Sequence, residues 1–186
     1  MRTFIAIELP AEIKSALAAA QDELRQARAQ VSWTRPDNLH LTLKFLGEIE
    51  AAQINSIAQA CEETARQYAA LSLQLDQLGC FPNPRQPRVV WAGLAGDLPA
   101  LTELQKRLED QLAVLGLTHD IKPFRPHLTL GRVKTPPKGK QLVEALAAYR
   151  LPTLSFTAAE IVLLQSQLQP TGSIYTPLHH ARLGAT

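Results

Sequence analysis

The sequence predicts an α+β protein with two similar lobes, related by a pseudo-twofold axis, around a central cleft. The tetrapeptide His-Leu-Thr-Leu occurs at 40–43 and again, 87 residues later, at 127–130. Strand-like and helix-like hydrophobic patterns follow in the same order around both copies. The length of 186 residues suits one compact unit. We therefore expect a single domain over 1–186, made of two repeats at about 2–87 and 88–183.

Each repeat has the pattern strand, helix, strand, helix, strand. Apolar residues alternate along the expected strands and recur every three or four residues along the expected helices. The first repeat is expected to form strand 2–9, helix 10–29, a strand from 40, helix 50–69 and strand 71–76. The second is expected to form strand 88–94, helix 98–115, a strand from 127, helix 138–149 and strand 153–164. A last strand is expected over 174–182, with turns at 79–87, 134–139 and 170–172. Each lobe should thus hold a mostly antiparallel sheet and two helices.

The bulk composition excludes several classes of protein. The chain has 19 Lys and Arg against 17 Asp and Glu, a formal net charge of +2, which excludes a polycationic nucleic-acid coat but not a local phosphate site. No apolar run reaches the roughly 18 residues that span a bilayer. Glu8 interrupts the N-terminal apolar stretch, so we expect no signal peptide and a cytoplasmic protein without membrane contact. Cys61 and Cys80 are expected to be reduced.

The repeated tetrapeptide places a histidine and a threonine side by side. Residues i and i+2 of a strand share a face, so His40 lies beside Thr42, and His127 lies beside Thr129. The leucines between them take the opposite face and can pack against the helices. Strict alternation also places Phe45 on the core side.

The same alternation assigns two cations to the histidine face. Lys44 continues the face of His40 and Thr42, and Arg125 precedes His127 in phase. Either charge would stabilise the crowded, negatively charged transition state of phosphoryl transfer. Both are therefore predicted phosphate contacts.

Two such faces across one cleft supply the chemistry of a phosphodiester reaction. An imidazole can take or give a proton near neutral pH, and a threonine hydroxyl can donate to a non-bridging phosphoryl oxygen. The paired histidines predict a general acid and a general base, although two nearly identical motifs leave open which is which. Two histidines with hydroxyls are a poor zinc ligand set, so no metal and no cofactor are expected.

Chance does not account for the repeat. With 30 Leu and 13 Thr in the chain, a chance duplication of the tetrapeptide around any two of the five histidines has a probability of about 3 in 100,000. A duplication retained only for packing would keep the leucines, whereas histidine and threonine lie on the polar face. We interpret the four polar residues as catalytic.

These motifs resemble those of the 2H phosphoesterase superfamily. The segments 33–47 and 123–132 are similar to the two signatures of the bacterial and archaeal RNA 2′,3′-cyclic phosphodiesterases, once called 2′-5′ RNA ligases. The segments 90–93 and 166–175 also resemble that group, and the resemblance extends over 2–183. It implies a bilobal fold and metal-independent hydrolysis of 2′,3′-cyclic phosphate ends of RNA to 2′-phosphomonoesters.

The resemblance also implies roles for the four motif residues. His127 would be the proton acceptor that activates water, and His40 the proton donor to the departing 3′ oxygen. Thr42 and Thr129 would hold the phosphate oxygens. The expected partners are RNA ends or nucleotides with a 2′,3′-cyclic phosphate, bound by a monomer.

Two aromatic residues near the motifs are candidates for contact with the substrate. Phe124 directly precedes the second motif, and Tyr175 ends the last segment of the resemblance. Two other functions stay open at this point. The same site could act reversibly on 2′-5′ linkages as an RNA ligase or phosphodiesterase, or the protein could bind RNA ends without catalysis.

Overall fold

The computed structural model describes residues 1–134 and 140–184, which form four α-helices and one nine-stranded sheet. The strands are β1 (Arg2–Glu8), β2 (Val31–Trp33), β3 (His40–Glu48), β4 (Leu71–Phe81), β5 (Val89–Gly96), β6 (Leu128–Val133), β7 (Ser155–Ala158), β8 (Glu160–Gln169) and β9 (Gly172–Arg182). The helices are α1 (Ala11–Arg25), α2 (Ile54–Ala65), α3 (Leu98–Val114) and α4 (Lys140–Ala148). The expected turn at 134–139 lies mostly outside the described residues.

The sheet joins two four-stranded halves at its centre. Its order is β7-β4-β5-β6-β3-β1-β8-β9, with the short β2 beside β6, and every described strand pair is antiparallel. The halves meet where β3 pairs with β6 through Leu41 and Leu128. This arrangement confirms the predicted α+β class and its two lobes.

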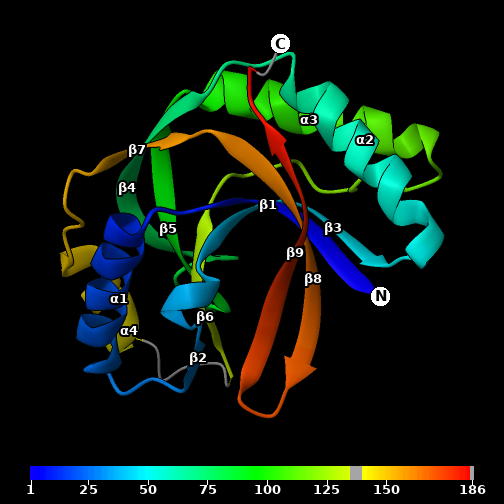
Figure 1. The fold of residues 1–186 in the computed structure, drawn as a ribbon. Helices are drawn as coiled ribbons and strands as arrows, with labels where there is room; N and C mark the ends of the chain where they lie inside the picture. The colour runs from blue at the N-terminus through cyan, green and yellow to red at the C-terminus, as the bar shows by residue number, and fades with distance from the viewer. Residues whose placement is uncertain (135–139, 185–186) are drawn as a thin grey trace.

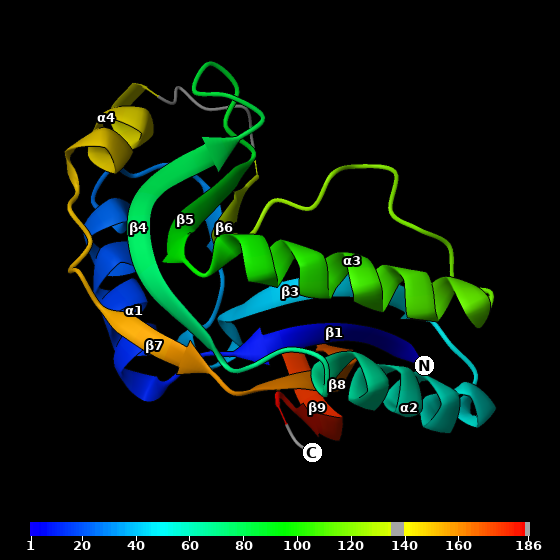
Figure 2. The ribbon, with the colours of Figure 1, turned by 90° about the horizontal axis from the view of Figure 1, so that it is seen from above.

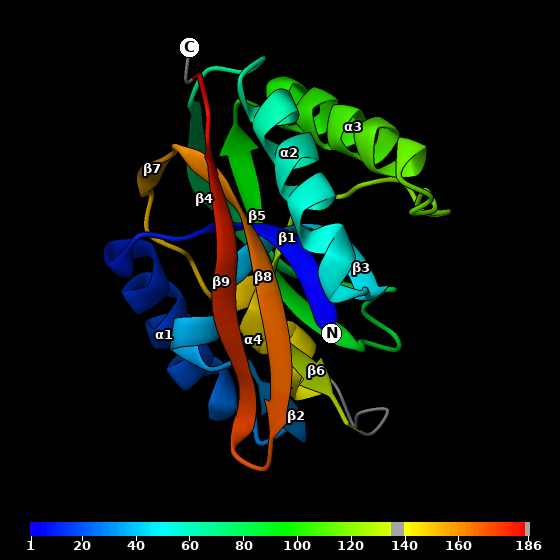
Figure 3. The same cartoon turned by 45° about the vertical axis from the view of Figure 1, so that its right-hand side comes forward.

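The helices cover the two halves in crossed pairs. Helices α2 and α3 lie together over the half that contains β1, β3, β8 and β9, whereas α1 and α4 lie beside the other half (Figures 1 and 2). Helix α1, from the first repeat, therefore lies beside the half that holds most strands of the second repeat. Helix α3, from the second repeat, lies over the half that holds β1 and β3 of the first repeat. The terminal strands β8 and β9 complete the half that begins with β1, as Figure 3 shows. Each lobe is thus built from both repeats.

The main core lies between the sheet and the helices. Helix α3 buries one leucine every three or four residues, namely Leu101, Leu104, Leu108 and Leu112. The leucines of both motifs point into this core and are fully buried at Leu41 and Leu128. The opposite sheet face carries only a small apolar cluster of Phe4, Ala6, Val162 and Leu164. The polar side chains of both motifs occupy this second face.

Two elements differ from the sequence prediction. The strand expected over 153–164 is two strands, because the chain leaves β4 at Ala158 and pairs with β1 from Val162 onward. One residue links these strands although the sheet order sets them far apart, so the sheet must curl strongly (Figure 2). The short strand β2 was not expected, since three residues are too few for a periodic signal.

The length and polarity of the helices bear on whether any of them could span a bilayer. Within 1–134 and 140–184, none is long and apolar enough to cross a membrane.

Candidate active site

The pairing of β3 with β6 brings the two motifs together. Leu41 lies opposite Leu128 in an antiparallel register, and one further residue in each direction sets His40 opposite Thr129 and Thr42 opposite His127. Because both leucines face the core, all four polar side chains face the other way. His40, Thr42 and Thr129 line a cleft of about 310 Å³ there. His127 directly precedes β6 at its edge.

His40 is held in a defined orientation. Its Nδ1 lies 2.6 Å from the carbonyl oxygen of Asn38, which can only accept, so Nδ1 carries the proton. Its Nε2 lies 2.8 Å from Oγ1 of Thr42. The ring packs against Phe4 at 4.9 Å and edge-on to Tyr175 at 5.4 Å. The nitrogen available for proton transfer is therefore Nε2, beside the threonine.

The environment of His40 favours its neutral form. Burial lowers the pKa of His40 below its ordinary value, and the positive charge of Lys14 lowers it further. The hydrogen bond to the Asn38 carbonyl acts in the opposite direction. An anion bound beside Nε2 would favour the imidazolium and raise this pKa.

His127 repeats the same local arrangement in a more open setting. Its Nδ1 lies 2.6 Å from the carbonyl oxygen of Arg125, two residues earlier, as in the first motif. Its ring packs edge-on to Phe81 at 5.1 Å. Both histidines thus present Nε2 for chemistry, and each is fixed by a backbone carbonyl.

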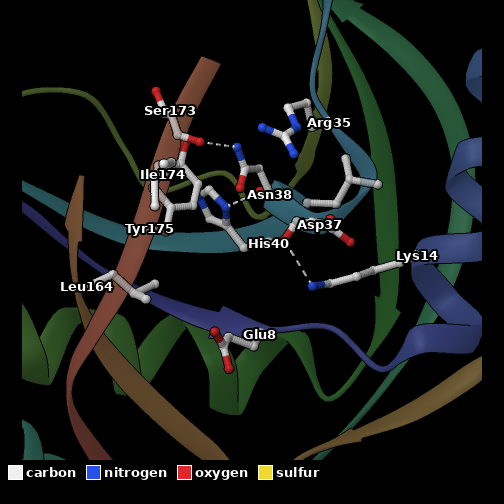
Figure 4. Close-up of a pocket in the computed structure, with 11 residues that line it drawn as sticks. Glu8, Lys14, Arg35, Asp37, Asn38, His40, Leu164, Ser173, Ile174 and Tyr175 are labelled. Carbon is white, nitrogen blue, oxygen red and sulfur yellow. Dashed lines mark hydrogen bonds between the residues drawn. The ribbon is translucent and has the colours of Figure 1, made fainter. Parts of the chain in front are cut away.

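Asn38 connects the first motif to the β8–β9 hairpin. Its side-chain Nδ2 donates to the carbonyl oxygen of Ser173 at 2.8 Å, while its own carbonyl orients His40 (Figure 4). Ser173 and Tyr175 line the main cleft and also a second pocket of about 220 Å³ behind His40. Lys14 borders this second pocket and donates to the Asp37 carbonyl oxygen at 3.1 Å.

A β-bulge in β3 overturns two predictions. Ala6 pairs with Thr42, but Ile5 pairs with Lys44, so Leu43 is an extra residue in the strand. Leu43 and Lys44 consequently both turn toward the core and are buried. Phe45, predicted to be in the core, faces the cleft instead and is 59% exposed.

Lys44 therefore does not reach the cleft as predicted. Its ammonium nitrogen lies 2.9 Å from Oε1 of Glu109 and 2.9 Å from the carbonyl oxygen of Thr118. Asp120 Oδ1 is a third acceptor at 3.3 Å. Three acceptors saturate the three ammonium donors, so no donor is left for a phosphate.

Known proteins share this fold. The family model described as LigT like phosphoesterase matches residues 7–91 and 95–175. The chain belongs to the LigT-like phosphoesterase family. An RNA 2′,3′-cyclic phosphodiesterase of Methanothermobacter thermautotrophicus is 34% identical over 98% of this chain and 99% of its own length. A protein of the same name from Thermotoga maritima is 32% identical over 98% and 95% of the two chains.

Solved structures share the whole fold of this LigT-like phosphoesterase. TT0787 of Thermus thermophilus aligns with a TM-score of 0.81 at 32% identity, over 99% of this chain and 98% of that chain. E. coli LigT in its apo form aligns with a TM-score of 0.78 at 29% identity and the same coverage. E. coli LigT has also been crystallised with 3′-AMP.

The remaining predicted contacts of this phosphoesterase divide between the cleft and its surroundings. Tyr175 lines the cleft, and burial raises the pKa of its hydroxyl, which stays protonated at neutral pH. Phe124 packs against the main core instead of the cleft. Arg125 contributes its carbonyl to His127, and its side chain is not among the residues that line the cleft.

Two arginines in the cleft were missed by the sequence reasoning. Arg132 lines it because β6 also has an irregular register, in which Trp91 pairs with Thr129 but Val90 pairs with Gly131. The extra residue turns Arg132 to the side of Thr129, as the β3 bulge does for Phe45. Arg2 enters from the start of β1. Arg132 and Phe45 hold equivalent positions in the two repeats, five residues after His127 and His40. Aligning the repeats would therefore have assigned both residues to the same side of the sheet.

Proposed function

We propose that this LigT-like phosphoesterase hydrolyses 2′,3′-cyclic phosphate ends of RNA to 2′-phosphomonoesters by a metal-independent, two-histidine mechanism. The observation that carries the proposal is the shared polar face of His40, Thr42, His127 and Thr129, where each histidine presents Nε2. The names of the relatives at 32–34% identity support the substrate class.

The proposed reaction uses one proton acceptor and one proton donor. Nε2 of His127 removes a proton from water as the water oxygen attacks phosphorus. The P–O3′ bond breaks, and Nε2 of His40 transfers its proton to O3′. The products are a 3′-hydroxyl and a 2′-phosphate, and both histidines return to their starting forms by proton exchange with solvent.

The cleft favours an anion at the reacting position. Thr42 and Thr129 can donate to the non-bridging oxygens, and Arg2 and Arg132 supply positive charge. Among the described residues that line this cleft, none carries a carboxylate. Arg132 thereby takes the role that the sequence assigned to Arg125 and Lys44.

Aromatic side chains border the same cleft. Phe45 is largely exposed there, and Tyr175 lies on the β9 side. An exposed aromatic ring beside a phosphate site can stack on an unpaired base of single-stranded RNA. We propose Phe45, in place of Phe124, as the base contact.

The test is product analysis on nucleoside 2′,3′-cyclic phosphates with and without EDTA. His40→Ala and His127→Ala should each lower kcat by about 100- to 10,000-fold, the usual contribution of one acid or base. His180→Ala is the matched control, because His180 lies on β9 and pairs with Glu160 at 2.9 Å. Near-normal turnover in either motif variant would refute the two-histidine mechanism, and loss of turnover in EDTA would refute metal independence.

The same assay separates the alternatives. Faster turnover of a 2′-5′ dinucleotide than of a cyclic mononucleotide would favour the ligase-type reaction. Tight binding without turnover across the pH range would favour a binding module. A monomeric state and a cytoplasmic location stay predictions from the sequence, and sedimentation tests the first.

A further inference from the structure

A buried polar network lies beneath the β3 bulge. Lys44 and Glu109 form its ion pair, with side chains only 2% and 7% exposed. Gln105, one helical turn before Glu109 on α3, donates to Oε1 of Glu109 at 3.3 Å. Asp120, in the segment after α3, accepts from Lys44 and donates its backbone N–H to Oε2 of Glu109 at 3.3 Å. We call these four residues the Lys44 network.

We infer that the Lys44 network is a positioning element that holds Phe45 and His127 on the polar face of the sheet that carries both motifs. Its residues touch neither the cleft nor the motif side chains. They act instead by fixing the backbone of the β3 bulge and of the segment that leads to His127. The inference rests on the proposed function for its kinetic readout, and a second readout below does not depend on activity.

The first end of the network fixes the bulge. Gln105 Nε2 donates to the carbonyl oxygen of Leu43 at 3.2 Å, which ties the extra residue of β3 to α3. A regular strand would turn Lys44 to the cleft and bury Phe45, and burial of an aromatic ring is favourable. The bulged strand leaves Phe45 59% exposed. The buried polar contacts of Lys44 offset the lost burial of the Phe45 ring, and they stabilise the bulged form of β3.

The second end fixes the segment that leads to His127. Residues 115–127 form no helix or strand, and only Leu117 and Phe124 of this segment pack against the core. Between these two contacts, Lys44 binds the carbonyl oxygen of Thr118 and the carboxylate of Asp120. One ammonium on the first motif's strand therefore anchors the segment that ends in the second motif.

Stability and positioning can be separated in this network. Removal of one partner of a buried ion pair leaves an uncompensated charge and strongly destabilises a protein, whereas neutral replacement of both partners is often close to neutral. Lys44→Met leaves Glu109 unpaired. Lys44→Met with Glu109→Gln removes both charges, and the amide oxygen that replaces the carboxylate keeps an acceptor for one of the two donors, Asp120 N–H or Gln105 Nε2.

The experiment compares these two variants with the wild-type protein. The measurements are the melting temperature, kcat and KM on nucleoside 2′,3′-cyclic phosphates, and amide hydrogen exchange over 118–126. Lys140→Met is the control, because Lys140 forms an exposed ion pair with Glu144 on α4 at 3.9 Å, away from the segment 118–126. It should match the wild type in every measurement.

The expected result is a partial recovery. Lys44→Met should lower both the melting temperature and kcat/KM. The double variant should regain most of the melting temperature, yet its kcat/KM should stay roughly 10- to 100-fold low, because small misplacements of reacting groups are costly. Its amides over 118–126 should exchange faster than in the wild type.

Recovery of the melting temperature, kcat/KM and amide protection together in the double variant would overturn the inference and leave the network a purely structural feature. If the double variant does not fold, Asp120→Ala serves, because its side chain is 54% exposed and its loss removes only one loop contact. This variant should speed amide exchange over 118–126 at an unchanged melting temperature, and unchanged exchange would overturn the inference. Absence of turnover in the wild type would refute the proposed function and leave the exchange result valid.

Discussion

At the scale of residues, the two motif histidines have the same local hydrogen bond but different surroundings. His40 lies between Phe4 and Tyr175 and has a lowered pKa, whereas His127 lies at the open edge of β6. A general acid must hold its proton until the leaving oxygen needs it. In the proposed reaction, a bound anionic substrate would meet that condition by favouring the imidazolium of His40.

The pH dependence should identify the role of His40. As a proton donor with a lowered pKa, free His40 loses its proton below the range of an unperturbed histidine, about pH 6.5. The alkaline limb of kcat/KM should therefore lie below that pH, and the alkaline limb of kcat should lie higher. Lys14→Gln removes a positive charge that lowers this pKa, so it should move the alkaline limb of kcat/KM upward. Lys106→Gln, on the exposed face of α3, should not. Movement of the acidic limb instead would make His40 the base.

The two arginines near the second motif should differ in their effects. Arg132→Gln should lower kcat/KM by about 10- to 100-fold, the equivalent of roughly 1.5–3 kcal/mol for a hydrogen bond to a charged group. Arg125→Gln should change it little, because only the backbone carbonyl of Arg125 is used. Kinetics of both variants on one cyclic nucleotide test this pair. A larger loss in Arg125→Gln would restore the contact predicted from the sequence.

At the scale of elements, the β8–β9 hairpin supports the first motif. Asn38 holds the hairpin at Ser173 and orients His40 with its carbonyl. Replacing the Asn38 side chain removes its hydrogen bond to Ser173 but leaves its backbone carbonyl in contact with His40. The replacement should therefore weaken the attachment of the hairpin while His40 keeps its orientation.

Asn38→Ala should therefore raise KM more than it lowers kcat. The lost hydrogen bond, about 1 kcal/mol, loosens the wall that carries Tyr175. Asn38→Leu is the matched control for size, and it lacks the amide donor without adding a charge to the cleft, so it should give the same shift. Steady-state kinetics separate the two constants. A fall in kcat alone would show that Asn38 acts only through His40.

Bulges explain which residues of the motif strands the sequence predicted correctly. Period-two alternation gave the right face for His40, Thr42 and the leucines, because β3 is regular as far as Leu43. It failed at Lys44 and Phe45, since the bulge depends on Glu109 and Gln105, which lie more than sixty residues later. Strand periodicity holds no information about such distant partners.

At the scale of the whole molecule, each lobe takes helices from both repeats. Helix α1 packs with α4, and α3 packs with α2 and β3. A fragment that ends near residue 87 would lack the cover of its own strands and would expose their apolar face.

Separate fragments 1–87 and 88–186 should consequently show no cooperative thermal unfolding, whereas the full chain should. Circular dichroism of each fragment, and of an equimolar mixture, checks this. The mixture should regain part of the transition, because the missing helices return in trans. A cooperative transition in either fragment alone would show that its repeat folds independently.

The sequence by itself determined the α+β class, the order of most elements, the buried leucines and the four polar motif residues. These features follow from local periodicity and from the repeat, which are properties of neighbouring residues. Only the tertiary structure decided the crossed helices, the split of 153–164 into two strands and the exchange of Lys44 for Arg132 and Phe45 in the cleft. Those features depend on strand register and on buried charge pairs between segments that are distant in the chain. Local periodicity in the sequence cannot predict such long-range contacts.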